Sequence, residues 1–381
     1  MGIRKLKKFI EENIKESILP STFSPDSKLL IDGNGFLFFI LNHYICIDEQ
    51  TNKDENNILP PVERKYGGDF YEIYKRTKEE MVTFLNAKIQ PIFYWDGKKR
   101  RLKLETDIKR RNDILDSETK LFEYCIDGVK YNENEYPLPI LAKYQIQYVL
   151  KELQIKQVFC NEEADHILGK ISSDSFIHNY YNNNNNHETN NVQNNMIEKN
   201  QCVIYGNDSD FYLFKDARYV TFGSFFKESK LKTKIVTSNK NAATANINDN
   251  NNNVLSAIVY TRKIITNYLD MSESTFIDFA IYLGNDYTSH FSKNLFSFEN
   301  EEELVDYLLE SNDMHSIANL FSKYDEDNLD ASTVNEKLNE AITFSRLLYE
   351  LKPLDMFPFD DDEDDYGEVP ITINDNNNNV H

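Results

Sequence analysis

Cysteine is scarce in this chain and is never paired at short spacing. The 381 residues contain four cysteines, which stand far apart at Cys46, Cys125, Cys160 and Cys202. Zinc sites and disulfide-stabilised folds need several cysteines at close, recurring spacings. The sequence therefore predicts neither, and we expect four reduced thiols in an intracellular protein.

Long apolar runs are missing as well. The longest, Phe36 to Leu41, is far shorter than the roughly 20 residues that a helix needs to cross a bilayer. The N-terminus carries Arg4, Lys5, Lys7 and Lys8 but no apolar stretch typical of a secretion signal. We therefore expect no membrane segment. The apolar content of 40% is sufficient for a folded core.

Net positive charge is also absent, since 63 acidic residues outnumber 42 basic ones and the formal net charge is −21. Phosphate binding depends on clustered Lys and Arg, so the overall charge disfavours a nucleic-acid partner. The basic residues are nevertheless concentrated at 98–111, KKRRLKLETDIKRR, where eight of fourteen are Lys or Arg. This run predicts a phosphate-binding surface, although a solvated face is an equally good interpretation of a charge run. The expected nucleic-acid contacts are Lys98, Lys99, Arg100, Arg101, Lys109 and Arg111.

Carboxylates follow the ends of four predicted strands, at 28–31, 91–95, 157–160 and 203–206, and of one amphipathic helix that ends at Leu283. Any one of these acids also fits a turn or a helix cap. Their repetition favours a shared role, because the carboxyl ends of parallel strands meet at one edge of an α/β sheet. The acids are Asp32, Asp96, Glu163, Asp165, Asp208, Asp210 and Asp286.

Seven carboxylates at one edge repel one another and raise each other's pKa unless cations neutralise them. Oxygen ligands without His or Cys favour Mg²⁺ or Mn²⁺ over zinc. Two such ions about 4 Å apart form the arrangement that catalyses in-line displacement at phosphorus. The acids therefore predict a site for two Mg²⁺ or Mn²⁺ ions beside the basic run, with phosphodiester hydrolysis as its chemistry.

Two stretches rich in asparagine interrupt this order of elements, at 181–200 and 238–253. Neither contains enough apolar surface to offset the entropy of ordering. We expect both to be disordered insertions in surface loops. An unbroken acidic run at 360–365 lies in the segment 353–381, which we expect to be a disordered tail.

Six motifs, in order, resemble those of the flap-endonuclease/XPG group of PIN-like nucleases, and within that group most resemble the asteroid family. They run from Met1 to about Tyr287 and read MGIRKLKKFIEEN, LLIDGNG, FYWDGKK, NEEADH, NDSDFYLF and YLGNDY. The resemblance implies that the seven acids form the family's two-metal site. It implies that Lys103 and Arg110 are the catalytic pair that steers the scissile phosphate, and that Gly2 approaches the substrate at the active site. A nuclear location is implied by the family alone.

One departure from the family is visible in the sequence. After YLGNDY the flap endonucleases continue into a glycine-rich helix-two-turn-helix that grips duplex DNA, whereas this chain has no glycine between Gly284 and Gly367. Duplex binding of that kind is therefore not expected here.

Together these observations predict an α/β fold of PIN-like type over residues 1–290, with a mostly parallel central sheet and helices on both faces. A helical C-terminal subregion is expected over 291–352. The expected function is metal-dependent, structure-specific hydrolysis of phosphodiester bonds in nucleic acid, structured or single-stranded, with DNA preferred to RNA. The alternative is a non-catalytic PIN-like module of the asteroid type, which regulates or scaffolds by binding nucleic acid or protein.

Overall fold

The computed structural model describes residues 3, 6–46, 57–64, 68–127, 138–139, 141–184, 196–227, 254–288 and 331–355. At its centre is a five-stranded sheet in the order β6-β5-β2-β8-β9, in which each neighbouring pair is parallel. Its strands are β2 (Lys28–Asp32), β5 (Gln90–Trp95), β6 (Lys156–Phe159), β8 (Cys202–Gly206) and β9 (Tyr219–Thr221). The predicted α/β fold with a mostly parallel central sheet is confirmed.

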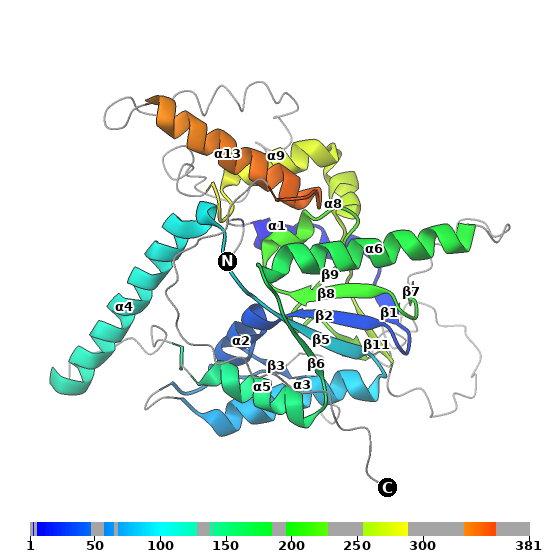
Figure 1. The fold of residues 1–381 in the computed structure, drawn as a ribbon. Coiled ribbons are helices and arrows are strands. Elements are labelled where there is room, and N and C mark those ends of the chain that lie inside the picture. The colour runs from blue at the N-terminus through cyan, green and yellow to red at the C-terminus, as the bar shows by residue number, and fades with distance from the viewer. Residues whose placement is uncertain are drawn as a thin grey trace, which may run out of the picture.

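Helices cover both faces of this sheet, as predicted (Figure 1). In β8 all five residues are buried: Val203 and Tyr205 belong to one core, and Cys202 and Ile204 to the other. Burial on both faces explains why the strands are continuously apolar. The first core is closed by α2 (Gly33–Asn42), α3 (Phe70–Asn86) and α5 (Ala142–Glu152). The second is closed by α1 (Leu6–Asn13), α6 (Ala164–Asn184), α8 (Arg262–Leu269), α9 (Glu273–Leu283) and α13 (Ala331–Tyr349).

A smaller sheet, which the sequence did not predict, lies beside the first core. Its order is β10-β11-β1-β7, with β1 antiparallel to β11 and parallel to β7. The strands are β1 (Ser21–Phe23), β7 (Met196–Ile197), β10 (Phe226–Lys227) and β11 (Leu255–Ala257). A separate antiparallel pair joins β3 (Ile45–Cys46) to β4 (Asn57–Ile58).

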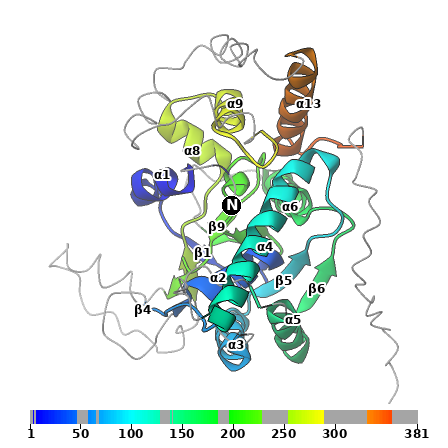
Figure 2. The same cartoon turned by 90° about the vertical axis from the view of Figure 1, so that its left-hand side faces the viewer.

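The helix α4 (Leu104–Asp127) stands apart from these layers. It follows β5 through a short 3-10 turn at Arg101–Lys103, so it begins inside the basic run. Figures 1 and 2 show it standing beside the sheet, at the side where the parallel strands end, with its length projecting away from the body. Only its first turns lie close to the strand ends, which limits the basic side chains that can approach the acids.

The predicted segment boundaries are corrected at two places. Helix α6 continues to Asn184 and β7 covers Met196–Ile197, so both ends of the stretch 181–200 are ordered. Leu354, placed in the predicted tail, is 3% exposed and packs in the second core. Residues 238–253, 289–330 and 356–381 lie outside the described residues, so the other disorder predictions and most of the predicted helical subregion are not described. No described helix is long and apolar enough to cross a membrane.

Candidate functional site

A cavity of about 360 Å³ opens at the carboxyl edge of the central sheet. Five of the seven predicted acids line it, and so do both members of the predicted catalytic pair. The lining acids are Asp32, Asp96, Asp165, Asp208 and Asp286, and the lining cations are Lys103 and Arg110. We call this space the acid cavity. Strands β2, β5 and β8 and helices α6 and α9 each contribute an acid at or just beyond one end, so the fold itself gathers them.

Asp32 and Asp208 cap the elements that follow their strands. The Oδ1 atom of Asp32 accepts a hydrogen bond from the backbone N–H of Gly35 at 3.0 Å, at the start of α2. The Oδ1 atom of Asp208 accepts one from the N–H of Asp210 at 3.1 Å, at the start of a 3-10 turn. Both interpretations of the sequence therefore hold, because each residue is a cap and also lines the acid cavity.

Asp96 is fixed by two donors from other elements. Its Oδ2 atom accepts from the Nδ2 of Asn34 at 2.6 Å, and its Oδ1 atom accepts from the backbone N–H of Ala164 at 2.8 Å. The next residue, Gly97, donates its N–H to the carbonyl of Glu162 at 3.0 Å. A Cβ on Gly97 would lie 2.0 Å from the carbonyl oxygen of Cys160, so only glycine permits this approach. The close contact brings the ends of β5 and β6, and hence Asp96 and Asp165, to the same place.

Asp286 reaches the cavity through a second glycine. Helix α9 ends at Gly284, whose φ of +93° lies in the region that favours glycine. The following Asn285 is 1% exposed and donates from Nδ2 to Ser345 Oγ and to the Tyr349 hydroxyl of α13, each at 2.9 Å. Its Oδ1 atom accepts from the N–H of Tyr287 at 2.9 Å. Asn285 thus ties the turn that carries Asp286 to α13, a role that the sequence did not indicate.

The remaining two predicted acids, Glu163 and Asp210, are not among the residues that line the acid cavity. Glu163 accepts hydrogen bonds at Oε2 from Lys103 Nζ at 2.9 Å and from the Tyr287 hydroxyl at 2.8 Å. Asp210 is 6% exposed, and its Oδ1 atom accepts no hydrogen bond within the described part of the chain. A buried carboxylate oxygen without a donor is costly, and either a proton or a bound cation would relieve that cost.

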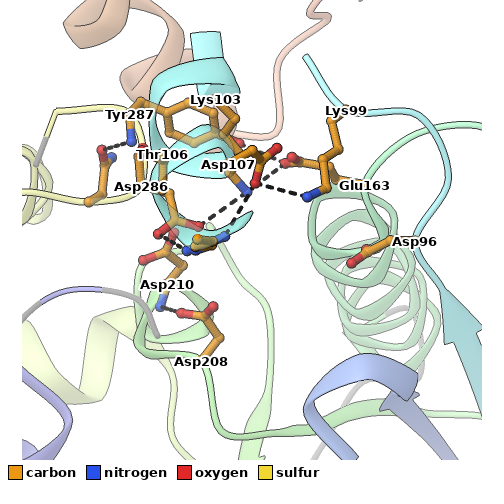
Figure 3. A network of polar contacts seen from close by, with 12 residues as sticks. Asp96, Lys99, Lys103, Thr106, Asp107, Glu163, Asp208, Asp210, Asp286 and Tyr287 are labelled. Atoms are coloured by element: carbon orange, nitrogen blue, oxygen red, sulfur yellow. Dashed lines mark hydrogen bonds and ion pairs between the residues drawn. The ribbon is translucent and has the colours of Figure 1, made fainter. Parts of the chain in front are cut away.

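The two predicted catalytic cations are engaged with acids. Lys103 Nζ lies 2.9 Å from Glu163 and 3.3 Å from Asp286, and it stands 5.0 Å from the centre of the Tyr287 ring. Arg110 donates to Asp286 Oδ1 at 2.8 Å. Figure 3 shows these contacts joining the first turns of α4 to the Asp286–Tyr287 segment and to Glu163. Through these contacts Lys103 and Arg110 offset the negative charges of Glu163 and Asp286.

The pKa values follow this division. Burial, followed by the charges of Asp96 and Asp208, raises the pKa of Asp32 to about 7. Burial and neighbouring carboxylates likewise raise the pKa of Asp165 and of Asp210 well above the ordinary value. Burial also acts to raise the pKa of Asp286, but Lys103 and Arg110 outweigh it and hold that pKa below its ordinary value. The ionised forms of Asp32, Asp165 and Asp210 therefore lack the compensation that the two cations give to Asp286.

These residues fit a hard divalent cation. The donors are carboxylate oxygens, burial and then neighbouring carboxylates raise the pKa of Asp165 and of Asp210, and Asp210 has a buried oxygen without a donor. Among the described residues, however, no three His, Cys, Asp or Glu side chains are already arranged as a formed metal site. The acid cavity is thus a carboxylate-lined space of suitable chemistry rather than a preassembled coordination shell.

The other predicted nucleic-acid contacts divide into three groups. Lys98, Lys99, Arg101, Lys109 and Arg111 are exposed, and Lys99 forms an ion pair with the buried Asp107 at 2.8 Å. Arg100 is 7% exposed and donates to Glu162 at 2.5 Å and to the Leu354 carbonyl at 3.1 Å, so its guanidinium is engaged inside the protein. Gly2 lies outside the described residues, although Ile3 beside it is buried and donates its N–H to the hydroxyl of Ser209.

Seven of the lining residues were not predicted from the sequence, among them Phe38 and Asn34. Phe38 is 41% exposed and lines the acid cavity together with Asn34, on the same helix α2. Its position within the apolar run FLFFIL concealed it, because the neighbouring Phe36 and Phe39 are buried as core residues should be. Helical spacing offers the signal: Phe38 lies four residues after Asn34 and therefore on the same helix face.

No protein-family model matches the chain. A zebrafish (Danio rerio) protein described as single-strand DNA endonuclease ASTE1 is 25% identical over 288 residues, which cover 75% of this chain and 33% of that protein. The resemblance to the asteroid family is confirmed. The chain spans about a third of the length of this asteroid relative.

Solved structures give looser similarities. The catalytic core of Rad2 in complex with DNA substrate superposes with a TM-score of 0.46 at 14% identity, over 92% of this chain and 86% of that one. Human GEN1 in complex with Holliday junction DNA superposes with a TM-score of 0.36 at 11% identity, over 92% of this chain and 66% of that one. With TM-scores below 0.5, neither superposition supports the transfer of a residue's role.

Proposed function

We propose that this protein is a metal-dependent nuclease that hydrolyses phosphodiester bonds in nucleic acid, with DNA preferred to RNA. The observation that carries the proposal is the acid cavity, where five carboxylates and two cations from separate segments of the chain meet. The asteroid relative's description as a single-strand DNA endonuclease supports this choice of substrate. We further propose a nuclear location, as the resemblance implies.

The seven acids would hold two ions, Mg²⁺ or Mn²⁺. Bound there, such ions supply a hydroxide-like water at neutral pH and offset the charge of the phosphate. Asp32, Asp96, Asp165 and Asp208 line the cavity together, and burial and crowding raise the pKa of Asp32 and of Asp165, while Asp210 and Glu163 would complete the set from outside the lining. The uncompensated carboxylates of the metal-free protein would thereby gain the positive charge that they lack.

Lys103 and Arg110 would bind the scissile phosphate. In the metal-free protein both contact Asp286, and a phosphate entering the cavity offers the same cations a second anion. Their charges would then stabilise the negative charge that develops on the phosphate oxygens. Phe38, an exposed ring on the cavity wall, would stack on a base next to that phosphate.

A substrate panel tests the proposal. Labelled flap, overhang, hairpin and single-stranded substrates, each as DNA and as RNA, are incubated with the protein and Mg²⁺ or Mn²⁺. We expect cleavage of DNA with an unpaired portion, abolished by chelator and restored by added metal. Failure to cleave any substrate, with metal binding shown by calorimetry, would reject the proposal and favour the non-catalytic regulatory module.

A further inference from the structure

A second cavity, of about 860 Å³, is lined by the segments that directly follow β5 and β6, next to the residues that these segments contribute to the acid cavity. Its walls come from the segment after β5, the start of α6 and the segment after α13, which Figure 2 shows on one side of the molecule. We call it the basic cavity. Its lining residues are Lys98, Arg100, Asn161, Glu162, His166, Ile167, Lys170, Leu351, Lys352, Pro353, Leu354 and Asp355.

The charge of the basic cavity is opposite to that of the whole chain. Lys98, Lys170 and Lys352 are exposed, and none of them forms an ion pair with an acid in the described ranges. Arg100 is already balanced by Glu162 at 2.5 Å. Three ammonium groups therefore share one cavity in a protein of net charge −21, and Asp355 alone among the lining acids is left to oppose them. A polyanion is the ligand that such a cavity binds.

The two cavities are separated by a thin wall. Asp96 lines the acid cavity and Lys98, two residues later, lines the basic cavity; Asp165 and His166 are divided in the same way. The wall is held by the hydrogen bonds from the N–H of Gly97 to the Glu162 carbonyl and from the N–H of Lys98 to the Asn161 carbonyl. A strand with one phosphate in the acid cavity therefore needs only to pass over this wall to reach the lysines.

The lining chemistry selects the backbone of a strand rather than its bases. Among its lining residues the imidazole of His166 is the one aromatic ring, and no Phe, Tyr or Trp lines the basic cavity, so it offers little surface on which bases could stack. Lys contributes point charges that suit phosphate oxygens. The acid cavity, by contrast, has Phe38 on its wall.

We infer that the basic cavity binds backbone phosphates of the same nucleic-acid strand whose scissile phosphate lies in the acid cavity. The inference rests on the proposed nuclease function and adds a second point of contact that sets the path of the strand across the protein. Lys98, Lys170 and Lys352 are its phosphate ligands, and Arg100 holds the wall through Glu162 and the Leu354 carbonyl.

Binding of single-stranded DNA tests the inference. The triple variant Lys98→Ala, Lys170→Ala, Lys352→Ala is compared with wild type by fluorescence anisotropy, using labelled oligothymidylates in a graded series of lengths. Ca²⁺ replaces Mg²⁺, and gels check that the strands stay intact. The control is the triple variant Lys75→Ala, Lys151→Ala, Lys156→Ala, which removes three equally exposed charges from α3, α5 and the amino end of β6.

The expected result is a Kd for long strands that rises on the order of tenfold in the first variant only, while the shortest strands bind as they do to wild type. The slope of log K against log salt should fall by about 2, the value for three lost contacts to a single strand. Exchange of the three lysines for arginine should restore both quantities. Equal affinities and slopes in the two triple variants would overturn the inference alone, whereas wild type that binds no strand would overturn it together with the proposed function.

Discussion

Lys103 is a buried cation whose charge is divided between two acids of the site. It is 8% exposed, contacts Glu163 and Asp286, and has a pKa raised well above its ordinary value, since these charges and Tyr287 outweigh the effect of burial. Such a group is charged at neutral pH. It can therefore act as a fixed electrostatic partner but not as a proton donor.

Replacement of Lys103 should separate these roles. Lys103→Met keeps the length of the side chain and removes its charge, and we expect the rate of DNA cleavage to fall on the order of a hundredfold because transition-state charge loses a partner. Lys120→Met, at an exposed position farther along α4, is the matched control. Circular dichroism and metal titration establish that both variants fold and bind ions. A rate equal to wild type would show that Lys103 only neutralises the acids around it.

Phe38 allows a second prediction at this scale. If its exposed ring stacks on a base, Phe38→Ala should weaken the binding of single-stranded DNA by roughly 1–3 kcal/mol, which is about five- to 150-fold in Kd. Phe38→Tyr should retain the affinity because the ring is preserved. Tyr71→Ala removes another highly exposed ring, on α3, and serves as the control. An unchanged affinity of Phe38→Ala for single-stranded DNA would show that Phe38 lines the cavity without contacting a base.

Glu80 predicts a pH dependence of stability that is independent of the acid cavity. It is 3% exposed in the first core, where it accepts hydrogen bonds from the Tyr205 hydroxyl at 2.6 Å and the Tyr44 hydroxyl at 3.3 Å. Burial outweighs these bonds and raises its pKa from 4.5 to about 7. Because the folded pKa lies above the unfolded one, the stabilisation is complete below about pH 4.5 and is lost as the pH rises through about 7.

This difference in pKa corresponds to about 3 kcal/mol between the two limits. Urea unfolding of wild type should therefore show a free energy of unfolding that falls with rising pH, and Glu80→Gln should remove about that part of the fall. Glu79→Gln, the neighbouring position on α3, should leave the pH dependence as in wild type. Parallel pH profiles for wild type and Glu80→Gln would contradict the raised pKa.

At the scale of elements, α13 supports the turn that carries Asp286. Asn285 joins that turn to Ser345 and Tyr349, and the Tyr287 and Phe344 rings lie 4.5 Å apart. Asn285 also accepts from the backbone N–H groups of Tyr287 and Thr288. The position of Asp286 thus depends on a helix more than 40 residues later in the chain.

Asn285→Ala should reveal this dependence. The substitution leaves buried backbone donors without acceptors, so we expect a loss of roughly 2–3 kcal/mol in the free energy of unfolding. We also expect a reduced cleavage rate with little change in DNA affinity, because Asp286 loses its position while the exposed basic residues do not. Ser345→Ala, which removes one of these contacts, should have a smaller effect of the same kind. An unchanged rate in a destabilised Asn285→Ala protein would show that α13 supports the fold alone.

The sequence predicted the elements whose pattern is local. Strands β2, β5, β6 and β8 are apolar runs that end in acids, and their parallel order brings Asp32, Asp96, Asp165 and Asp208 to one edge. The small second sheet was missed because its strands have two or three residues and pair across great distances, as Ser21 does with Ala257. The burial of Arg100 and Lys103 within the basic run could not be predicted either. The acids that pair with them, at 162, 163 and 286, lie far away in the sequence.

At the scale of the whole molecule, a strongly acidic protein is proposed to act on a polyanion. The fold makes this possible by separating charge: carboxylates crowd into one cavity at the sheet edge, and basic side chains surround it from the β5–α4 segment and the neighbouring cavity. Metal bound in the acid cavity would reverse the sign of the local charge toward the substrate. We therefore expect hydrolysis of the phosphodiester bond to occur in the acid cavity.

The most direct test is the single-turnover rate of cleavage of labelled single-stranded DNA by wild type, Asp165→Asn and Asp270→Asn in saturating Mg²⁺. Asp165 lines the cavity, whereas Asp270 is exposed at the end of α8, in a left-handed conformation that asparagine also adopts. We expect Asp165→Asn to fold normally and, in chelator, to be more stable than wild type because it lacks one of the crowded carboxylates. We expect it to cleave DNA at least on the order of a hundredfold more slowly than wild type. Asp270→Asn should cleave at the wild-type rate. Cleavage by Asp165→Asn at the wild-type rate would place the chemistry elsewhere and contradict the account.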